Sequence, residues 1–312
     1  MVDQLKKTVL KVNSISKDFM NVKAVNAISF SVEQGDIYAF LGPNGAGKTT
    51  TLRMLLDIIK PDSGSIEWNL NGKQNQVPDA EDIGYLPEER GLYLDVPILK
   101  SLVYLATIRG MEKTEAKKSA LDWLEKLGLA DRAKEKLQVL SKGNQQKIQF
   151  VASILHKPAF AILDEPFSGL DPLNQELFID FIKEINKQGT TILLSAHQMQ
   201  LVEKTAHKIF LINKGEVLYN GSLNGIYETY GNKPIIELNF KSGLNLDALN
   251  AIGAVEDMEI SDHHLVKLTF RQNTDMKLIL ADLAKLEGVF ELSSHKPSLH
   301  DIYLNLVKRH SI

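Results

Sequence analysis

Apolar and polar residues alternate along the start of the chain in the manner of β-strands. The segments at 8–15 (TVLKVNSI) and 26–42 (NAISFSVEQGDIYAFLG, with a QGD turn inside it) are rich in β-branched and apolar side chains. From Lys48 the apolar spacing becomes helical and continues to Ile59, before PDSG at 61–64 stops it. The pattern therefore predicts strands, a glycine-rich loop and a helix, in that order.

Helical spacing dominates residues 98–138, where two amphipathic patterns follow one another. Three short apolar runs come later, FAILDEP, TTILLSAH and HKIFLIN, each bounded by turn or polar residues. Continuous apolar runs of this length are typical of buried strands in a largely parallel sheet. We expect an α/β region that is interrupted by a helical insert and ends near Gly221.

A different pattern begins beyond residue 222. Segments typical of a strand, a helix, two strands, a helix and a strand follow one another, and a last helix is predicted from Ser298. That order is the split βαβ pattern of a small α+β domain. We therefore expect two domains, 1–222 and 223–312, which agrees with a length of 312 residues at about 100 to 200 residues per domain.

Composition and charge exclude several classes of protein. Hydrophobic residues make up 44% and charged residues 24% of the chain, so disordered and disulfide-scaffold classes do not fit. The net charge of −3 gives no bulk attraction to nucleic acid or to an anionic membrane surface. There is no cysteine, which excludes disulfides, thiolate metal sites and cysteine catalysis. Neither a membrane-spanning run nor a signal peptide is visible, so a cytosolic location is expected.

A phosphate-binding motif lies between the predicted strand and helix. Residues 42–49 (GPNGAGKT) match G-x-x-x-x-G-K-[ST] in the context that the motif requires. Backbone N–H groups of such a loop surround phosphate oxygens, the lysine adds a mobile cation, and the hydroxyl serves Mg²⁺. A glycine-rich turn with an accidental lysine is the alternative. The predicted ATP-binding residues are Gly42, Pro43, Asn44, Gly45, Ala46, Gly47, Lys48, Thr49 and Thr50.

Two adjacent carboxylates follow a predicted buried strand. Asp164 and Glu165 come directly after the run at 160–163, at the strand end where ligands bind in open α/β sheets. Asp164 is suited to hold Mg²⁺ with Thr49, and Glu165 to polarise an attacking water. His197 follows the next apolar run, which would bring it toward the γ-phosphate. The alternatives are a solvated acid pair and a histidine of the surface or core.

Further along, the segment LSKGNQQK at 140–147 resembles the LSGGQ signature of ABC transporter ATPases. The phosphate loop, the acidic pair, SGLDP at 168–172 and His197 are similar to motifs of that family in the same order, over about residues 5–221. The resemblance implies an α/β fold of the P-loop ABC ATPase class, with a mixed-sheet core and a helical subdomain at about 90–150. A small α+β, ferredoxin-like C-terminal domain would follow it.

The resemblance also implies roles for individual residues. Phe19 would stack on adenine, with an ordinary core phenylalanine as the alternative. The signature residues Ser141, Lys142, Gly143 and Asn144 would face the γ-phosphate of ATP held by a second cassette, and Ser141 is also a plausible helix N-cap. Asp171 would be the D-loop aspartate. Catalysis would rest on Glu165, His197 and Lys48, with ATP and Mg²⁺ as cofactors.

Three features depart from the common family pattern. Lys142 stands where a glycine is usual, and Asn144 where a glutamine is usual. Glu88 occupies the position of the Q-loop glutamine; an ionised carboxylate can still ligate Mg²⁺ but donates no hydrogen bond.

The segment 223–312 is similar to the extra domain of cassettes from sodium and drug exporters. There it would support dimerisation, regulate the cassette or simply pack against it.

The resulting hypothesis is an ATP-hydrolysing subunit of an ABC exporter. Its partners would be a second cassette, identical or paralogous, and a transmembrane permease, and no nucleic acid is expected. The chain would lie on the cytoplasmic face of the membrane through its permease. The alternatives are a cytosolic ABC ATPase acting on ribosomes or DNA, and a cassette that only binds ATP, which the intact Lys48, Asp164, Glu165 and His197 disfavour.

Overall fold

The computed structural model describes residues 7–20, 22–89, 91–231, 233–241, 243–262, 264–271 and 273–310. The chain divides into two compact units, Met1–Gly221 and Ser222–Ile312. Among the described residues, no helix has the length and apolar character needed to cross a membrane.

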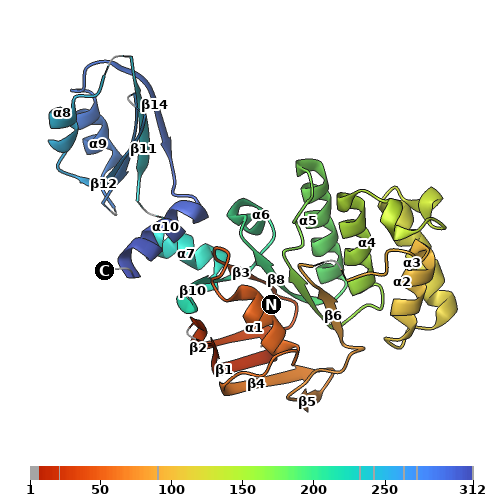
Figure 1. Ribbon diagram of the computed structural model, residues 1–312. Coiled ribbons are helices and arrows are strands. Elements are labelled where there is room, and N and C mark those ends of the chain that lie inside the picture. The colour runs from red at the N-terminus through yellow and green to blue at the C-terminus, as the bar shows by residue number, and fades with distance from the viewer. Residues whose placement is uncertain are drawn as a thin grey trace, which may run out of the picture. The chain divides into compact units, whose positions relative to one another are not determined.

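The first unit combines two sheets with surrounding helices (Figure 1). A six-stranded sheet has the order β10-β9-β3-β8-β7-β6, and a four-stranded sheet has the order β2-β1-β4-β5. The strands are β1 (Thr8–Phe19), β2 (Val22–Glu33), β3 (Ile37–Leu41), β4 (Ser63–Leu70), β5 (Lys73–Asn75), β6 (Ile83–Leu86), β7 (Phe160–Asp164), β8 (Thr191–Ala196), β9 (Lys208–Asn213) and β10 (Glu216–Ser222). The helices are α1 (Lys48–Leu55), α2 (Ile98–Thr107), α3 (Lys113–Lys126), α4 (Lys142–Ile154), α5 (Pro172–Lys187) and α6 (Met199–Glu203), with short 3₁₀ turns at Ala130–Arg132 and Leu137–Val139.

The six-stranded sheet is largely parallel, as its continuous apolar runs predicted. β3 pairs in parallel with β8 and β9, and β7 pairs in parallel with β6 and β8. Every residue of β3, β7 and β8 is buried, so both faces of the sheet are covered. The carboxyl ends of these strands therefore meet at one edge, where the loop after β3 and the acids after β7 lie.

The alternating segments near the N-terminus form the antiparallel sheet. β1 pairs with both β2 and β4, and its inward side chains join a core that also includes residues of α1 and of the parallel strands. Phe30, Tyr38, Phe40 and Phe210 form an aromatic cluster there, with ring centroids 4.8–5.9 Å apart. Two hydrophobic layers are thus joined beneath the loop that follows β3.

The helix after the glycine-rich loop is shorter than its apolar spacing predicted. α1 ends at Leu55 instead of continuing to Ile59. Asp57 adopts a left-handed backbone conformation, with φ of 59°, which ends the helical turn. Ile59 nevertheless packs against the core, so its apolar character reflects burial and not helical structure.

The second unit begins with a helix that was not predicted, α7 (Leu223–Tyr230), and then has the predicted element order with a four-stranded antiparallel sheet. Its other elements are β11 (Ile235–Phe240), α8 (Leu246–Asn250), β12 (Val255–Asp262), β13 (Leu265–Phe270), α9 (Met276–Leu283), β14 (Val289–His295) and α10 (Leu299–His310). The strand order β12-β13-β11-β14 is that of a ferredoxin-like fold. Its core lies between one face of this sheet and helices α8 and α9.

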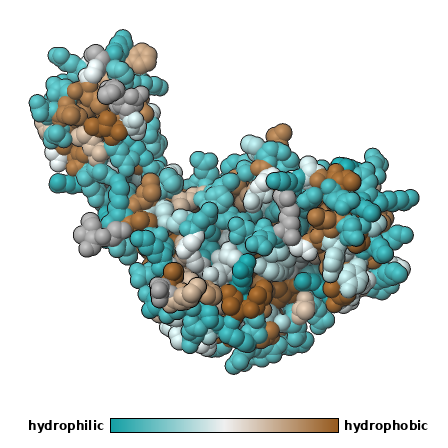
Figure 2. All heavy atoms as spheres, viewed as in Figure 1, coloured by the Kyte–Doolittle hydropathy of each residue, from teal (hydrophilic) through white to brown (hydrophobic). Residues whose placement is uncertain are grey.

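Hydrophobic residues are mostly inside each unit. On the face shown in Figure 2, hydrophilic residues cover much of the surface and hydrophobic residues form separate patches. Buried polar residues of the first unit are few, and several of them lie at the carboxyl edge of the parallel sheet: Lys48, Gln146, Asp164, Glu165 and Ser195. Buried polar groups need specific partners, so this edge of the sheet is the candidate functional site.

Candidate nucleotide-binding site

The glycine-rich loop leads from β3 into α1 and lies close to neighbouring backbone. A Cβ atom on Gly42 would be 2.2 Å from the Ile212 carbonyl oxygen, and one on Gly47 would be 2.4 Å from the Ala24 carbonyl oxygen. Gly47 also has a φ of 104° at the N-cap of α1. Only glycine fits these two positions, and the loop they allow leaves the free N–H groups of the helix start available to an anion.

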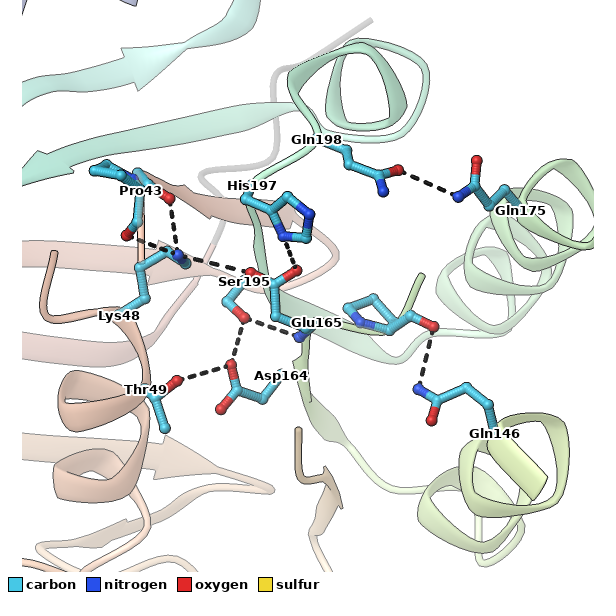
Figure 3. A network of polar contacts seen from close by, with 12 residues as sticks. Pro43, Lys48, Thr49, Gln146, Asp164, Glu165, Gln175, Ser195, His197 and Gln198 are labelled. Atoms are coloured by element: carbon cyan, nitrogen blue, oxygen red, sulfur yellow. Dashed lines mark hydrogen bonds and ion pairs between the residues drawn. The ribbon is translucent and has the colours of Figure 1, made fainter. Parts of the chain in front are cut away.

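Lys48 is buried and lies between the loop and the acidic pair (Figure 3). Its Nζ donates hydrogen bonds to the carbonyl oxygens of Gly42 at 2.8 Å and Pro43 at 3.2 Å. The same atom lies 3.6 Å from Glu165 Oε1. The ammonium group is thus held by the loop itself, in the position from which a lysine of this motif meets phosphate oxygens.

Asp164 ends β7 and is fully buried. Its Oδ1 accepts hydrogen bonds from Thr49 Oγ1 at 3.3 Å and from Ser195 Oγ, whereas its Oδ2 is buried and has no hydrogen-bond partner among the described residues. Burial raises the pKa of the Asp164 carboxyl, although the bonds from Ser195 and Thr49 act in the opposite direction. An unpartnered buried carboxylate oxygen beside a hydroxyl is a suitable place for a hard cation.

The acids available to a cation at this edge are few. No group of three or more acidic or histidine residues that would form a metal cage occurs in the part of the chain that the structure describes. Mg²⁺, however, is commonly held by one or two protein oxygens together with substrate phosphates and water. Asp164 and Thr49 fit that mode of binding, because they leave the other ligand positions to the phosphates.

Glu165 leaves the strand in a left-handed conformation, with a φ of 51°. Its N–H donates to Ser195 Oγ at 2.9 Å, and its Oε2 lies 2.8 Å from Nδ1 of His197. The backbone turn therefore directs Glu165 toward Lys48 and His197, while the preceding Asp164 faces Thr49 (Figure 3). A strained backbone at such a residue is typical of functional sites.

Ser195 is a part of this site that the sequence pattern did not identify. It lies within β8, fully buried, and its hydroxyl joins the side chain of Asp164 to the backbone of Glu165. The signal available beforehand was a hydroxyl in an otherwise apolar run that ends before His197. A second such residue is Gln146, whose Nε2 donates to the Pro166 carbonyl oxygen at 3.3 Å and so connects α4 to the loop after Glu165.

The signature residues form the start of α4 and are separate from this network. Ser141 is the N-cap of α4, with its Oγ accepting from the Asn144 N–H at 3.3 Å. Ser141 and Lys142 are exposed, and a Cβ atom on Gly143 would lie 3.6 Å from the Gly169 carbonyl oxygen. None of the side-chain interactions found among the described residues joins these residues to Lys48. Within one chain, the signature and the phosphate loop are therefore not part of one polar network.

Asp171 and Phe19 lie outside the network as well. Asp171 is the N-cap of α5, and its Oδ1 accepts from the Asn174 N–H at 3.0 Å, a bond that lowers the pKa of the carboxyl. Phe19 ends β1 with 43% of its surface exposed, so it is not a core residue. Lys17 Nζ lies 5.7 Å from the centroid of the Phe19 ring, and the ring is accessible to a ligand.

The segment after β6 carries Glu88, which is exposed. The carbonyl oxygens on either side, those of Pro87 and Glu89, accept hydrogen bonds from Gln149 Nε2 at 3.2 and 3.1 Å. Gln149 belongs to α4, so the helix that begins at the signature also holds the backbone around Glu88. Burial raises the pKa of the nearby Tyr85 hydroxyl, with a further contribution from the charge of Asp164.

Comparisons with known proteins show the family to which this chain belongs. Residues 25–168 match the ABC transporter family. The ABC transporter ATP-binding protein YhaQ of Bacillus subtilis is 37% identical over 310 residues, covering 96% of this chain and 98% of the relative. The linearmycin resistance ATP-binding protein LnrL of the same organism is 31% identical over 309 residues, covering 96% and 99%.

A solved structure supports the same assignment. The ATP-binding subunit of an ABC transporter is 29% identical to this chain, with a TM-score of 0.66 over 72% of this chain and 94% of the solved one. The predicted P-loop ABC ATPase fold is confirmed by this match. The chain belongs to the ATP-binding subunits of ABC transporters, and it is an ATPase.

Proposed function

We propose that this chain hydrolyses ATP to drive a separate membrane permease, and that this permease is an exporter. Support for the direction comes from LnrL, which aligns with this chain over 309 residues and is named for linearmycin resistance. Export of a toxic compound is one means of resistance. The alignment with LnrL covers 96% of this chain and therefore extends into the second unit.

The observation that carries the proposal is the position of Glu165 between Lys48 and His197. Glu165 accepts a proton from the water that attacks the γ-phosphorus of ATP, and ADP leaves from the opposite side. Lys48 stabilises the negative charge on the β- and γ-phosphates. His197 holds the Glu165 carboxylate in one orientation and reaches the γ-phosphate with its other ring nitrogen.

Mg²⁺ would be held by Thr49 and Asp164, with Glu88 as a further candidate ligand. The buried, unpartnered Oδ2 of Asp164 supports this assignment. When bound, the cation neutralises phosphate charge in the transition state. Thr50 and the loop backbone from Gly42 to Thr49 hold the phosphates, and the exposed ring of Phe19 stacks on the adenine.

A second cassette completes each ATP site. The exposure of Ser141 and Lys142, and their separation from the Lys48 network, support a contact made across two chains. Gly143, Asn144 and the start of α4 present N–H groups and a positive helix end to the γ-phosphate held by the partner. Asp171, which begins α5, lies on the loop that follows Glu165 and would meet the partner in the same closure.

The movement of the two cassettes as they close on ATP would be transmitted to the permease through α2, α3 and the segment around Glu88. Gln149 supports this route, because it belongs to the signature helix and holds the carbonyl oxygens beside Glu88. The chain would thereby be located at the cytoplasmic face of the membrane. Such opening and closing is a two-state element that couples hydrolysis to movement of the permease.

The proposal is tested by isolating the tagged full-length chain from its own cells in a mild detergent. We expect a polypeptide with several membrane-spanning helices to co-purify with it. When the complex is reconstituted into proteoliposomes with the ATP-binding chain on the outside, a toxic compound should accumulate inside them only when ATP is added outside. Co-purification with ribosomal proteins, or accumulation in the reverse direction, would contradict the transport or export assignment respectively.

A further inference from the structure

The two edges of the sheet in the second unit differ in how they are protected. On the β12 edge, acidic residues are paired with basic side chains from elsewhere in the unit. The β14 edge (Val289–His295, VFELSSH) has a single acid and no lysine, arginine or proline of its own. Its contacts with charged groups of the unit are looser: His295 Nε2 lies 3.9 Å from Glu237 Oε1, and Lys241 Nζ lies 5.4 Å from the centroid of the Phe290 ring. Natural sheets usually block exposed edges with such residues or with bulges, because an unblocked edge pairs with another strand.

The backbone of β14 has hydrogen-bonding groups that point away from the sheet. Phe270 N donates to Pro234 O and Phe240 N to His264 O, so the even-numbered residues of β11 bond to β13. Because bonding direction alternates along a strand, the odd-numbered residues of β11 bond to β14, opposite Glu291, Ser293 and His295. Leu292 and Ser294, which alternate with these residues, direct their N–H and C=O groups outward, whereas a register shift at Phe240 leaves Phe290 without a paired residue on β11.

Apolar side chains accompany these outward groups. Phe290 is 64% exposed and Leu292 is 41% exposed. Among the described strands, β14 lies at the edge of the sheet and pairs with β11 alone (Figure 1). An exposed strand with free backbone groups and apolar side chains is suited to receive a strand by β-sheet extension.

We propose that β14 pairs in antiparallel fashion with β14 of a second copy of this chain. A two-fold axis at Ser293 brings the outward groups of Leu292 and Ser294 into register with those of the partner. The same register sets Glu291 opposite the partner's His295, twice by symmetry, at a non-hydrogen-bonded position where side chains come closest. Centring the axis on Leu292 would set Glu291 opposite a serine and His295 opposite a valine, without this complementarity.

The role of this pairing rests on the proposed function, whereas the pairing itself does not. Two short strands bury less surface than a stable interface of about 1,600 Å², so the association is expected to be weak by itself. A weak contact at one place nevertheless raises the effective concentration for a second contact between the same two chains. The β14 pair would keep two cassettes together between cycles of ATP binding.

The test is the mass of the full-length chain without nucleotide, measured by analytical ultracentrifugation over a range of concentrations. Wild type is expected to shift from monomer to dimer as concentration rises. Ser294→Pro removes one outward N–H and should therefore remain monomeric. The variant should still fold, because proline is tolerated on an edge strand. Ser294→Ala keeps the N–H and should behave as wild type. A wild type that stays monomeric, or a Ser294→Pro variant that dimerises like wild type, would overturn the proposal.

A charge exchange tests the register. Glu291→Lys places a lysine opposite a histidine and should weaken the dimer at least several-fold. Adding His295→Glu restores opposite charges across the axis and should recover most of the wild-type association. A double variant that is as weak as Glu291→Lys, or a single variant without effect, would contradict the register.

ATP turnover separates this proposal from the proposed function. In Ser294→Pro, turnover per chain should match wild type at high protein concentration and fall more steeply on dilution. The same dilution curve for both proteins would remove the tethering role, while turnover itself would still support the ATPase. If neither protein hydrolyses ATP, the sedimentation result still decides whether the strands pair.

Discussion

His197 Nδ1 lies 2.8 Å from Glu165 Oε2, while Lys48 Nζ lies 3.6 Å from the other carboxylate oxygen, Oε1 (Figure 3). The contact joins the ends of two neighbouring parallel strands, β7 and β8. Glu165 already has a left-handed backbone, so the histidine provides the second constraint on where its carboxylate points. The position of one acid at this sheet edge thus depends on two features that are far apart in the sequence.

Replacing His197 by alanine should lower ATP turnover by about 10²-fold, because a carboxylate without this partner can rotate away from the attacking water. ATP affinity should fall far less than turnover, since the phosphate loop and Lys48 still hold the phosphates when the contact between His197 and the γ-phosphate is lost. Phosphate release and equilibrium binding of ATP check the two halves of the prediction. A loss of ATP affinity as large as the loss of turnover would assign His197 to binding and not to positioning.

Gly47→Ala should abolish nucleotide binding and reduce stability. The added Cβ would lie 2.4 Å from the Ala24 carbonyl oxygen at a residue with a φ of 104°, so the loop must move. Gly45→Ala is the matched control: its φ is 78°, but nothing lies within 4 Å of the added atom. Its cost is limited to backbone strain of about 1–2 kcal/mol. Thermal unfolding should separate the two variants, and an equal loss of stability in both would contradict the steric explanation. ATP binding is compared between Gly47→Ala and wild type alone, because Gly45 belongs to the phosphate loop itself.

The second unit supplies a prediction about pH. Burial raises the pKa of the Asp301 carboxyl, but hydrogen bonds from Lys267 and Ser298 outweigh it, so the pKa is lowered overall. A lowered pKa means that the folded state binds fewer protons than the unfolded state. The stabilisation is therefore present above the ordinary carboxyl pKa and disappears as pH falls through the lowered value.

Asp301→Asn should destabilise the protein at neutral pH by about 1 kcal/mol, and the difference from wild type should shrink in acid. Asp282→Asn is the control, because its ion pair with Lys285 is exposed on both sides and should contribute little. Urea unfolding of both variants near pH 7 and near pH 3 measures the effect. A difference at pH 3 as large as that at pH 7 would contradict the linkage.

Glu88→Gln should leave ATP affinity unchanged and alter how turnover responds to the permease. The amide can donate a hydrogen bond that the ionised carboxylate cannot, while the backbone around it stays held by Gln149. Turnover with and without the co-purified permease measures the response. Identical responses in the variant and wild type would remove any particular role for Glu88.

Much of the site was predictable because motif order implies geometry. Once the run at 160–163 is taken as a parallel strand, Asp164 and Glu165 must lie at its carboxyl end, beside the loop after β3. Ser195 could not be assigned a role in the same way. Its hydroxyl bridges two residues of a neighbouring strand, and only the register between β7 and β8 brings them together.

The sequence pattern predicted some elements of the fold and missed others. Many amphipathic or continuous apolar segments were recognised, whereas the helix α5 and the strands β4, β5, β6 and β10 were not predicted. β4 buries only Trp68 and Leu70 fully, and two apolar positions are too few for a periodic signal. α1 ends before Ile59 because Asp57 has a left-handed backbone conformation, which the apolar spacing does not reveal. Local conformations imposed by neighbouring elements account for these differences.

Glu165 is proposed to drive hydrolysis inside a site that two chains close together. The most direct test is the Glu165→Gln variant, made in the Ser294→Pro background so that strand pairing does not contribute to its mass. With ATP and Mg²⁺, this protein should release no measurable phosphate, retain bound ATP and sediment as a dimer, and it should be a monomer without nucleotide. Phosphate release close to that of Ser294→Pro alone, or a protein that binds ATP and stays monomeric, would contradict the claim.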